Sequence, residues 1–157
     1  MNTELIKKSI VEFLEKPWGA SIRLDDSQLD QFLKLYYKGV ELPDFPANTS
    51  LSPKCLILAP HKRFSWQVHQ RRWEVWRIAV GPTSLDQSET DEPPQQPERF
   101  AQGDVIKINE NMRHRAVGLD NWAVIAEIWV HTDANNPSDE DDIRRIADDF
   151  GRMSQQI

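Results

Sequence analysis

Apolar positions in the first forty residues follow the spacing of helices. In residues 3–16 they recur three or four positions apart, at Leu5, Ile6, Ile10, Phe13 and Leu14. This spacing predicts a helix, and Pro17 ends it because proline disfavours helical backbone in the residue before it. A second run of the same kind predicts another helix, with apolar positions at Leu29, Phe32, Leu33 and Tyr36. The pattern therefore predicts a helical N-terminal extension over residues 1–40.

The apolar period changes from Pro53 onward. Short β-branched or aromatic runs separated by turn residues predict strands over residues 21–24, 55–59, 64–69, 73–80, 104–109, 113–117 and 122–130. Residues 82–99 are polar and proline-rich and are expected to form a long surface loop. Residues 141–153 place Ile143, Ile146 and Phe150 on one side of a predicted C-terminal helix. We expect one mostly β domain over residues 1–157, with a small antiparallel barrel over 53–131 and a helix and tail over 139–157.

Composition narrows the class of protein. The chain has 157 residues and one Cys, so a disulfide framework and a Cys-rich zinc cluster are excluded. No apolar run approaches the ~20 residues of a membrane span, and charges interrupt the apolar positions of the N-terminus. We therefore expect a cytoplasmic protein without a membrane partner.

Charge is unevenly distributed along the chain. The formal net charge of −6 argues against a nucleic-acid partner. Between residues 61 and 77, however, five basic residues stand against Glu74 alone, whereas residues 132–157 hold seven acidic residues and three arginines. Two interpretations stay open: an unevenly charged solvated surface, or a local positive site for a small anion on an acidic protein.

Four polar side chains form a candidate metal site. Gln67 and His69 share one face of a predicted strand, because side chains two apart point the same way. After a turn at residues 70–72, Glu74 faces them from the neighbouring strand, and His114 follows another β-run. Two imidazoles, a carboxylate and an amide oxygen suit Zn²⁺, Fe²⁺ or Mn²⁺. The alternative is that these residue types occur together by chance.

Ordered motifs surround these residues. They are Lys-Pro-Trp-Gly at 16–19, Ser-x-Gln-x-His-x-x-Arg-x-Glu-x-Trp at 65–76, Gly-Asp-Val-Ile-Lys-Ile-Asn at 103–109 with Met-Arg-His-Arg after it, and an acidic stretch ending in Asp-Phe-Gly-Arg at 140–152. The chain resembles the cupin superfamily, and more narrowly the C-terminal cupin domain of type II mannose-6-phosphate isomerases. The resemblance implies a jelly-roll barrel and a homodimer.

The resemblance also implies a metal and a reaction. Gln67, His69, Glu74 and His114 match the positions of the family's metal ligands, and zinc is the expected ion, with manganese and iron as alternatives. The implied reaction interconverts an aldose and a ketose of a phosphorylated sugar through a cis-enediolate. The metal would orient the substrate oxygens and stabilise the developing negative charge.

Further residues are expected around the pocket. Arg72 shares the strand parity of Glu74, and together with Lys62 and Lys107 it would bind the phosphate. Arg72 and Glu127 are the candidate catalytic residues, with His131 as another candidate base. The alternative for Glu127 is a structural carboxylate, and for His131 a strand-end surface residue.

Some positions depart from the isomerase pattern. Lys16 stands where the family has Arg, Trp129 stands where it has Gln, and an Asn expected soon after the His-Arg pair is missing. The metal ligands thus match the family better than the sugar-binding residues do. Two other functions stay open: a non-catalytic cupin that binds a sugar or a small anion, and an iron-dependent cupin oxygenase. The six tryptophans are expected to fill the core.

Overall fold

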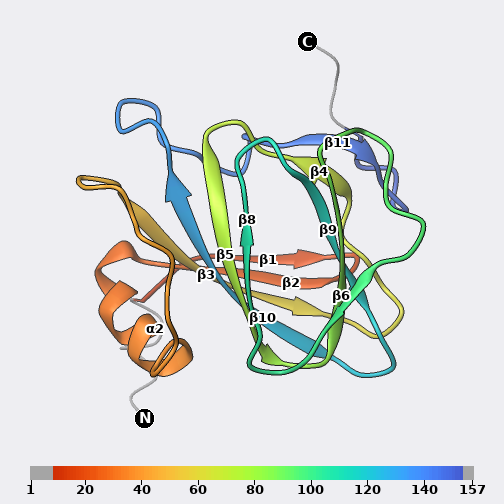
Figure 1. Ribbon diagram of the computed structural model, residues 1–157, viewed down its shortest axis with the longest axis horizontal. Coiled ribbons are helices and arrows are strands. Elements are labelled where there is room, and N and C mark those ends of the chain that lie inside the picture. The colour runs from red at the N-terminus through yellow and green to blue at the C-terminus, as the bar shows by residue number, and fades with distance from the viewer. Residues whose placement is uncertain (1–8, 154–157) are drawn as a thin grey trace.

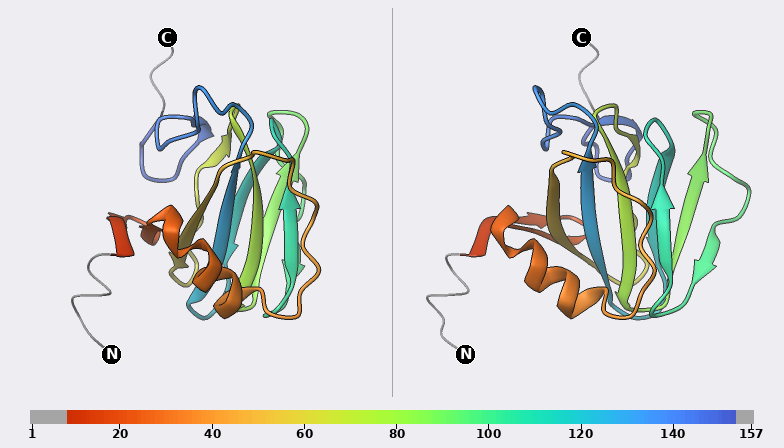
Figure 2. Two further views of the ribbon diagram at one scale, coloured as in Figure 1. Left: turned by 90° about the vertical axis from the view of Figure 1, so that its left-hand side faces the viewer. Right: turned by 60° about the vertical axis from the view of Figure 1, so that its left-hand side comes forward.

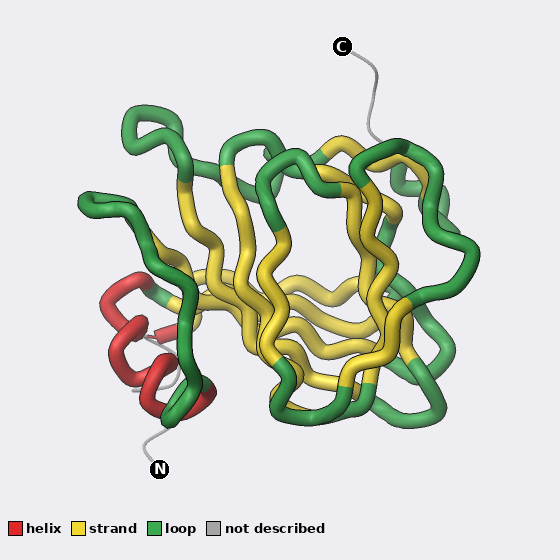
Figure 3. Tube along the Cα trace, viewed as in Figure 1, coloured by secondary structure: helices red, strands yellow, loops and turns green. Residues whose placement is uncertain are grey.

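Two antiparallel sheets packed face to face make up most of the structure (Figure 1). The computed structural model describes residues 9–153. The six-stranded sheet has the order β1(Ile10–Lys16), β2(Gly19–Leu24), β3(Leu51–Leu58), β10(Ala123–His131), β5(Arg72–Val80) and β8(Val105–Ile108). The five-stranded sheet has the order β11(Arg144–Ala147), β4(Trp66–Val68), β9(Arg113–Gly118), β6(Thr83–Ser88) and β7(Glu98–Phe100). The mostly β, jelly-roll prediction is confirmed, although the two sheets do not close into one barrel (Figure 3).

Alternating side chains of the six-stranded sheet divide between two apolar clusters. Inward residues pack between the sheets, among them Leu58, Trp76, Ile78 and Ile125. Outward residues pack beneath the one α-helix of the described chain, α2(Leu29–Tyr36), which follows a single 3-10 turn, η1(Asp26–Gln28) (Figure 2). The Tyr37 hydroxyl donates to the carbonyls of Val75 and Ala126, which fastens the helix end to β5 and β10.

The first predicted helix is wrong over the residues that the structure describes. Residues 10–16 form β1, and the rest of that prediction, residues 3–8, lies outside the described residues. Lys16 pairs with Gly19, so Pro17 and Trp18 are the tight turn of a β1–β2 hairpin. Pairing with β2 satisfies the backbone groups on one side of this edge strand, and this tertiary contact overrides the local helical spacing.

Gly19 is required where the hairpin crosses β3. Its φ is +144°, and a Cβ at this position would lie 1.9 Å from the carbonyl oxygen of Ile57. We expect Gly19→Ala to lower the free energy of unfolding by about 3 kcal/mol, because backbone strain and a backbone clash add. Urea unfolding followed by circular dichroism measures this. Gly39→Ala is the control: its φ is +73° but the space around it is open, so about 1 kcal/mol is expected. Equal losses in both variants would contradict the steric argument.

Two further sequence predictions are corrected toward the C-terminus. The segment 82–99 contains β6 and β7, hidden from the sequence because β6 buries polar side chains such as Thr83, Ser84 and Asp86. The predicted helix over residues 141–153 is absent, and β11 instead pairs with β4. Trp122 is 56% exposed and so does not fill the core as expected. No helix among the described residues is long and apolar enough to cross a membrane.

Candidate metal centre

Three buried side chains converge between the sheets. His69 follows β4 and His114 lies on β9, while Glu74 faces them from β5 in the other sheet. Their nearest ligand atoms all lie within 4.8 Å of one another. The Nε2 atoms of His69 and His114 are 3.4 Å and 3.3 Å from the two carboxylate oxygens of Glu74. The structure therefore brings together the predicted two imidazoles and one carboxylate.

Backbone carbonyls fix the tautomers of both imidazoles. His69 Nδ1 lies 2.6 Å from the carbonyl oxygen of Asp142, and His114 Nδ1 lies 2.9 Å from that of Met112. A carbonyl only accepts hydrogen bonds, so each Nδ1 carries a proton, and in a neutral imidazole Nε2 then presents a lone pair to the centre. Within the described chain, His114 Nε2 has no hydrogen-bond partner although it is buried. Burial, followed by the positive charge of Arg72, lowers the pKa of His69 well below its usual value. Neutral imidazoles with inward lone pairs fit a divalent metal ion.

Gln67 borders the same centre. Its Nε2 is 3.3 Å from His69 Nε2, and its Oε1 accepts a hydrogen bond from Ser65 Oγ at 2.6 Å. The amide nitrogen, rather than the predicted oxygen ligand, therefore faces His69. A half-turn of the amide would present the oxygen instead, and the Ser65 hydroxyl can accept from the nitrogen as well as donate to the oxygen.

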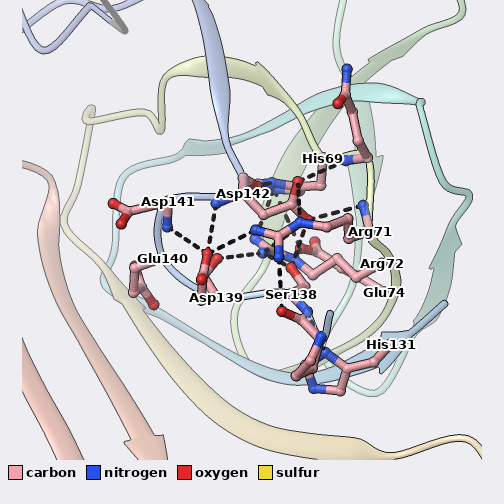
Figure 4. Close-up of polar contacts among 12 residues, drawn as sticks. His69, Arg71, Arg72, Glu74, His131, Ser138, Asp139, Glu140, Asp141 and Asp142 are labelled. Carbon is pink, nitrogen blue, oxygen red and sulfur yellow. Dashed lines mark hydrogen bonds and ion pairs between the residues drawn. The ribbon is translucent and has the colours of Figure 1, made fainter. Parts of the chain in front are cut away.

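The guanidinium of Arg72 is the cation beside Glu74 in this structure (Figure 4). Arg72 Nε donates to Glu74 Oε1 at 2.7 Å, and Nη2 lies 3.0 Å from His69 Nε2. The guanidinium also lies 3.9 Å from the centre of a Trp129 ring. Burial alone would raise the pKa of Glu74, but His69, Arg72 and His114 hold that pKa well below its usual value. Glu74 is therefore an ionised carboxylate, and the guanidinium of Arg72 is its permanent positive partner.

A second buried carboxyl lies next to Glu74. The Trp76 indole donates to Glu74 Oε2 at 3.0 Å and to Glu127 Oε1 at 2.9 Å. Burial, and then the negative charge of Glu74, raises the pKa of Glu127 to about 8. The two carboxyls thus differ in protonation near neutral pH, an arrangement typical of sites that transfer protons.

Comparisons with known proteins identify similar folds among solved structures but no match by sequence. No protein-family model matches the chain, and no curated protein matches it either. Among solved structures, the capsular polysaccharide assembling protein CapF from Staphylococcus aureus superposes with a TM-score of 0.54 at 14% identity, over 87% of this chain and 34% of CapF. Vicilin from Corylus avellana (hazelnut) gives 0.56 at 16% identity, over 80% of this chain and 32% of vicilin. KdgF from Halomonas sp. gives 0.51 at 11% identity, over 79% of this chain and 89% of KdgF.

These three neighbours are cupin-fold proteins. The protein has a cupin fold. This chain spans about a third of the length of CapF and of vicilin, and at such low identities the likeness shows the fold alone. In this fold, the His69–Glu74–His114 cluster lies between the two sheets.

The turn that carries Asp142 covers one side of the His69–Glu74–His114 cluster. The Asp142 carboxylate accepts hydrogen bonds from the backbone N–H groups of Gln70 and Arg71, each at 3.0 Å, and from Ser138 Oγ at 2.6 Å (Figure 4). Burial would raise the pKa of Asp142, but these hydrogen bonds lower it. Since the Asp142 carbonyl orients His69, the turn sets the direction of a metal-ligating imidazole.

We expect Asp142→Asn to weaken both the fold and the metal site. One of the two acceptor oxygens becomes an NH₂ group facing a donor, so the free energy of unfolding should fall by about 2 kcal/mol. Metal affinity should fall ~10-fold or more, because the orientation of His69 loosens. Urea unfolding and metal titration measure the two effects. Asp141→Asn is the matched control, since the Asp141 side chain is exposed; an equal effect there would refute this role.

His131 has a positioning role at the same turn. Its Nε2 is 2.9 Å from Ser52 Oγ, and its Nδ1 accepts from the backbone N–H of Ser138 at 3.0 Å. Both ring nitrogens are therefore engaged in holding β3 and the turn together. His131 is buried, not the surface residue considered as the alternative to a base.

A pocket beside the His69–Glu74–His114 cluster has a volume of about 60 Å³. Of the predicted residues, Gln67, Arg72 and Glu127 line it, but Lys62 and Lys107 do not. Lys107 lies over the Trp73 ring at 4.6 Å, on the outer face of the sheet, because its register partner is the outward-facing Val75. Lys62 is exposed on the turn that precedes β4. Neither lysine therefore lines this pocket.

Sequence reasoning missed four of the five cations that line the pocket. They come from β1, β3 and the C-terminal segment, and are Lys16, Lys54, Arg145 and Arg152. One signal was available: in β3, Ser52 and Lys54 share the inward parity of Leu56 and Leu58. A lysine at a core-facing position of a strand indicates a polar cavity within the core.

Proposed function

We propose that this cupin is a divalent-metal-dependent isomerase that interconverts an aldose and a ketose of a phosphorylated sugar, as mannose-6-phosphate isomerases do. The observation that carries the proposal is the buried cluster of His69, Glu74 and His114, in which two imidazole lone pairs are directed at one carboxylate. The isomerase-like motifs around this cluster support the choice of reaction. The proposal also includes a homodimer, which sedimentation velocity would test.

His69, Glu74 and His114 would hold the metal, with the Gln67 amide oxygen as a fourth ligand. Zinc is the proposed ion, with manganese and iron as alternatives, because imidazole and carboxylate ligands suit all three. When bound, the ion supplies a Lewis acid that polarises the substrate oxygens and stabilises negative charge on them.

Once ionised, Glu127 is the proposed general base; because its pKa is raised to about 8, the ionised form prevails at alkaline pH. It would take the proton from the carbon next to the carbonyl and return the same proton to the former carbonyl carbon, while the hydroxyl proton passes to the carbonyl oxygen. Trp76 holds the Glu127 carboxyl in place through its indole N–H. Arg72, which reaches both His69 and Glu74, would donate to an enediolate oxygen. His131 is not used, since Ser52 and Ser138 engage both of its ring nitrogens.

A second function is supported by the size of the pocket. A volume of about 60 Å³ holds a few water molecules and is small for a whole sugar phosphate. Binding such a substrate would require the C-terminal segment, which contributes Ile143 and Arg145 to the lining, to move. A non-catalytic cupin that binds a small anion needs no such movement. An iron-dependent oxygenase would also use two imidazoles and one carboxylate.

The test combines metal content with turnover. Protein purified without chelator is analysed for metal beside a His69→Ala/His114→Ala variant, with His61→Ala as the control because His61 is exposed. We expect stoichiometric metal that only the double variant loses, and interconversion of mannose 6-phosphate and fructose 6-phosphate by the metal-loaded protein. Metal without turnover would favour the binding protein, and oxygen consumption with iron would favour the oxygenase. Absence of metal after reconstitution would refute the proposal.

A further inference from the structure

We propose that the pocket beside the metal centre is an oxyanion site that binds a phosphate monoester through Lys16, Ser21 and Lys54 on one wall and Arg145 and Arg152 on the other. The inference rests on the proposed function in one respect only, the identity of the sugar that carries the phosphate. The binding residues themselves lie outside the metal cluster and come from three segments far apart in the sequence.

The two walls are parts of different elements. The β1–β2 hairpin and β3 supply Lys16, Ser21 and Lys54 from their inward faces, since Ser21 pairs with the core residue Leu56. The C-terminal segment supplies Glu140, Ile143, Arg145 and Arg152 from the other side. Figure 1 shows the β1–β2 hairpin running across the middle of the view and β11 at its upper right. A group bound between the walls would join the N-terminal hairpin to the C-terminal segment.

The lining carries an excess of positive charge. Five cations line the pocket, at Lys16, Lys54, Arg72, Arg145 and Arg152, against the two carboxyls of Glu127 and Glu140. Lys54 pairs with Glu140, and Arg152 pairs with Asp148 behind the pocket. Within residues 9–153, Lys16 forms no ion pair although it is half-buried beside other cations. Burial, opposed in part by Glu140, and the charges of Lys54, Arg145 and Arg152 together lower the pKa of Lys16. An anion would relieve this repulsion.

An unused hydroxyl is the second observation. Ser21 is 2% exposed and lines the pocket, and its Oγ has no hydrogen-bond partner among the described residues. A buried hydroxyl without a partner destabilises a fold, so such groups normally have an acceptor. The oxygen of a bound anion would provide one, and no neighbouring protein group does.

A phosphate monoester matches this set of donors better than other small anions. Ammonium, guanidinium and hydroxyl groups arranged on two walls suit several oxygens of a tetrahedral dianion, whereas a carboxylate has two coplanar oxygens. A pocket of about 60 Å³ admits a compact anionic group but not a sugar ring. The phosphate would therefore lie among the cations, with its ester oxygen directed toward Arg72 and the metal centre.

The test measures anion binding by calorimetry on metal-free protein. The probes are inorganic phosphate, mannose 6-phosphate, neutral mannose and succinate. We expect both phosphates to bind, mannose not to bind, and succinate to bind more weakly than either phosphate. Lys16→Gln and Ser21→Ala should each weaken phosphate binding ~10-fold, while Lys16→Arg should retain it. Lys62→Gln removes the same charge from an exposed position and should leave binding unchanged.

The outcomes separate this inference from the proposed function. The His69→Ala/His114→Ala variant should still bind phosphate, because neither imidazole lines the pocket. Phosphate binding in a protein that never takes up metal would refute the isomerase and support the anion site. Metal uptake without phosphate binding, binding of mannose as tight as that of its phosphate, or an equal loss in Lys62→Gln would each overturn the anion site. Circular dichroism of each variant shows whether it has folded.

Discussion

Metal affinity of the Glu74→Gln variant is expected to fall by ~100-fold or more, as judged from the 10–100-fold losses typical of residues that only support metal ligands. The change removes the negative charge that would compensate a divalent ion, and it leaves only the two neutral imidazoles of His69 and His114 aimed at the centre. Competition against a chromophoric chelator, with zinc and manganese as probes, measures the loss. Glu98→Gln, an exposed carboxyl on β7, is the matched control and should bind metal as the unmodified protein does.

The same substitution has a structural consequence that needs a second variant. Glu74 accepts from Arg72 in a buried ion pair, and breaking such a pair by removing one partner destabilises a protein by about 3–5 kcal/mol. If Glu74→Gln does not fold, His114→Gln tests the site instead. His114 Nε2 has no hydrogen-bond partner within residues 9–153, so that change breaks no side-chain hydrogen bond at this nitrogen. Unchanged metal affinity in a folded Glu74→Gln or His114→Gln protein would contradict the metal centre.

Arg72 connects the metal ligands to the turn that covers them. Besides Glu74 and His69, its guanidinium donates to Ser138 Oγ at 2.7 Å and to the carbonyl of Asp139 at 3.2 Å. The ligand atoms that would hold a metal are thus the atoms that hold this guanidinium. Metal binding to His69 and Glu74 therefore competes with contacts that fasten residues 138–142, the turn next to the pocket.

The metal cluster was predictable because it depends on local strand geometry. Alternation placed Gln67 and His69 on one face, and the turn after them returned Glu74 toward it. Placing His114 at the site requires only that a later strand lies next to the strand of Gln67. The register pair Gln67–His114 shows that it does. Residues close in sequence and constrained by a period of two leave few alternative arrangements.

The anion pocket was not predictable in the same way. Its cations lie on the β1–β2 hairpin, on β3 and near β11, and only the tertiary pairing of these elements brings Lys16 near Arg145 and Arg152. Two of the three segments were also assigned to helices, because apolar residues at short spacing fit either a helix or an edge strand. Lys62 and Lys107 are expected from the sequence as basic groups around the pocket, but strand parity places Lys107 on the outer face and Lys62 lies on an exposed turn.

Turnover and pH stability should both change in the Glu127→Gln variant. Because Glu127 is the proposed general base, replacing it should lower kcat by a factor of about 10²–10⁴. The effect of Glu127 on the pH dependence of stability can be measured without an activity assay. The pKa of Glu127 is raised from 4.5 to about 8 by burial and by Glu74. In metal-free protein the unfolded chain therefore ionises at a lower pH than the folded one, so the free energy of unfolding falls as pH rises from about 4.5 to about 8.

Each unit by which the folded-state pKa of Glu127 exceeds its unfolded-state pKa changes the free energy of unfolding by ~1.4 kcal/mol. The free energy of unfolding should therefore be several kcal/mol lower at alkaline than at acidic pH. Glutamine cannot ionise, and Glu127→Gln should flatten the profile and be the more stable protein at high pH. Urea unfolding of both proteins with chelator present, at several pH values across this interval, measures the difference. Glu98→Gln again serves as the control and should keep the unmodified slope. A Glu127→Gln profile parallel to that of the unmodified protein would contradict the raised pKa of Glu127 in the folded protein.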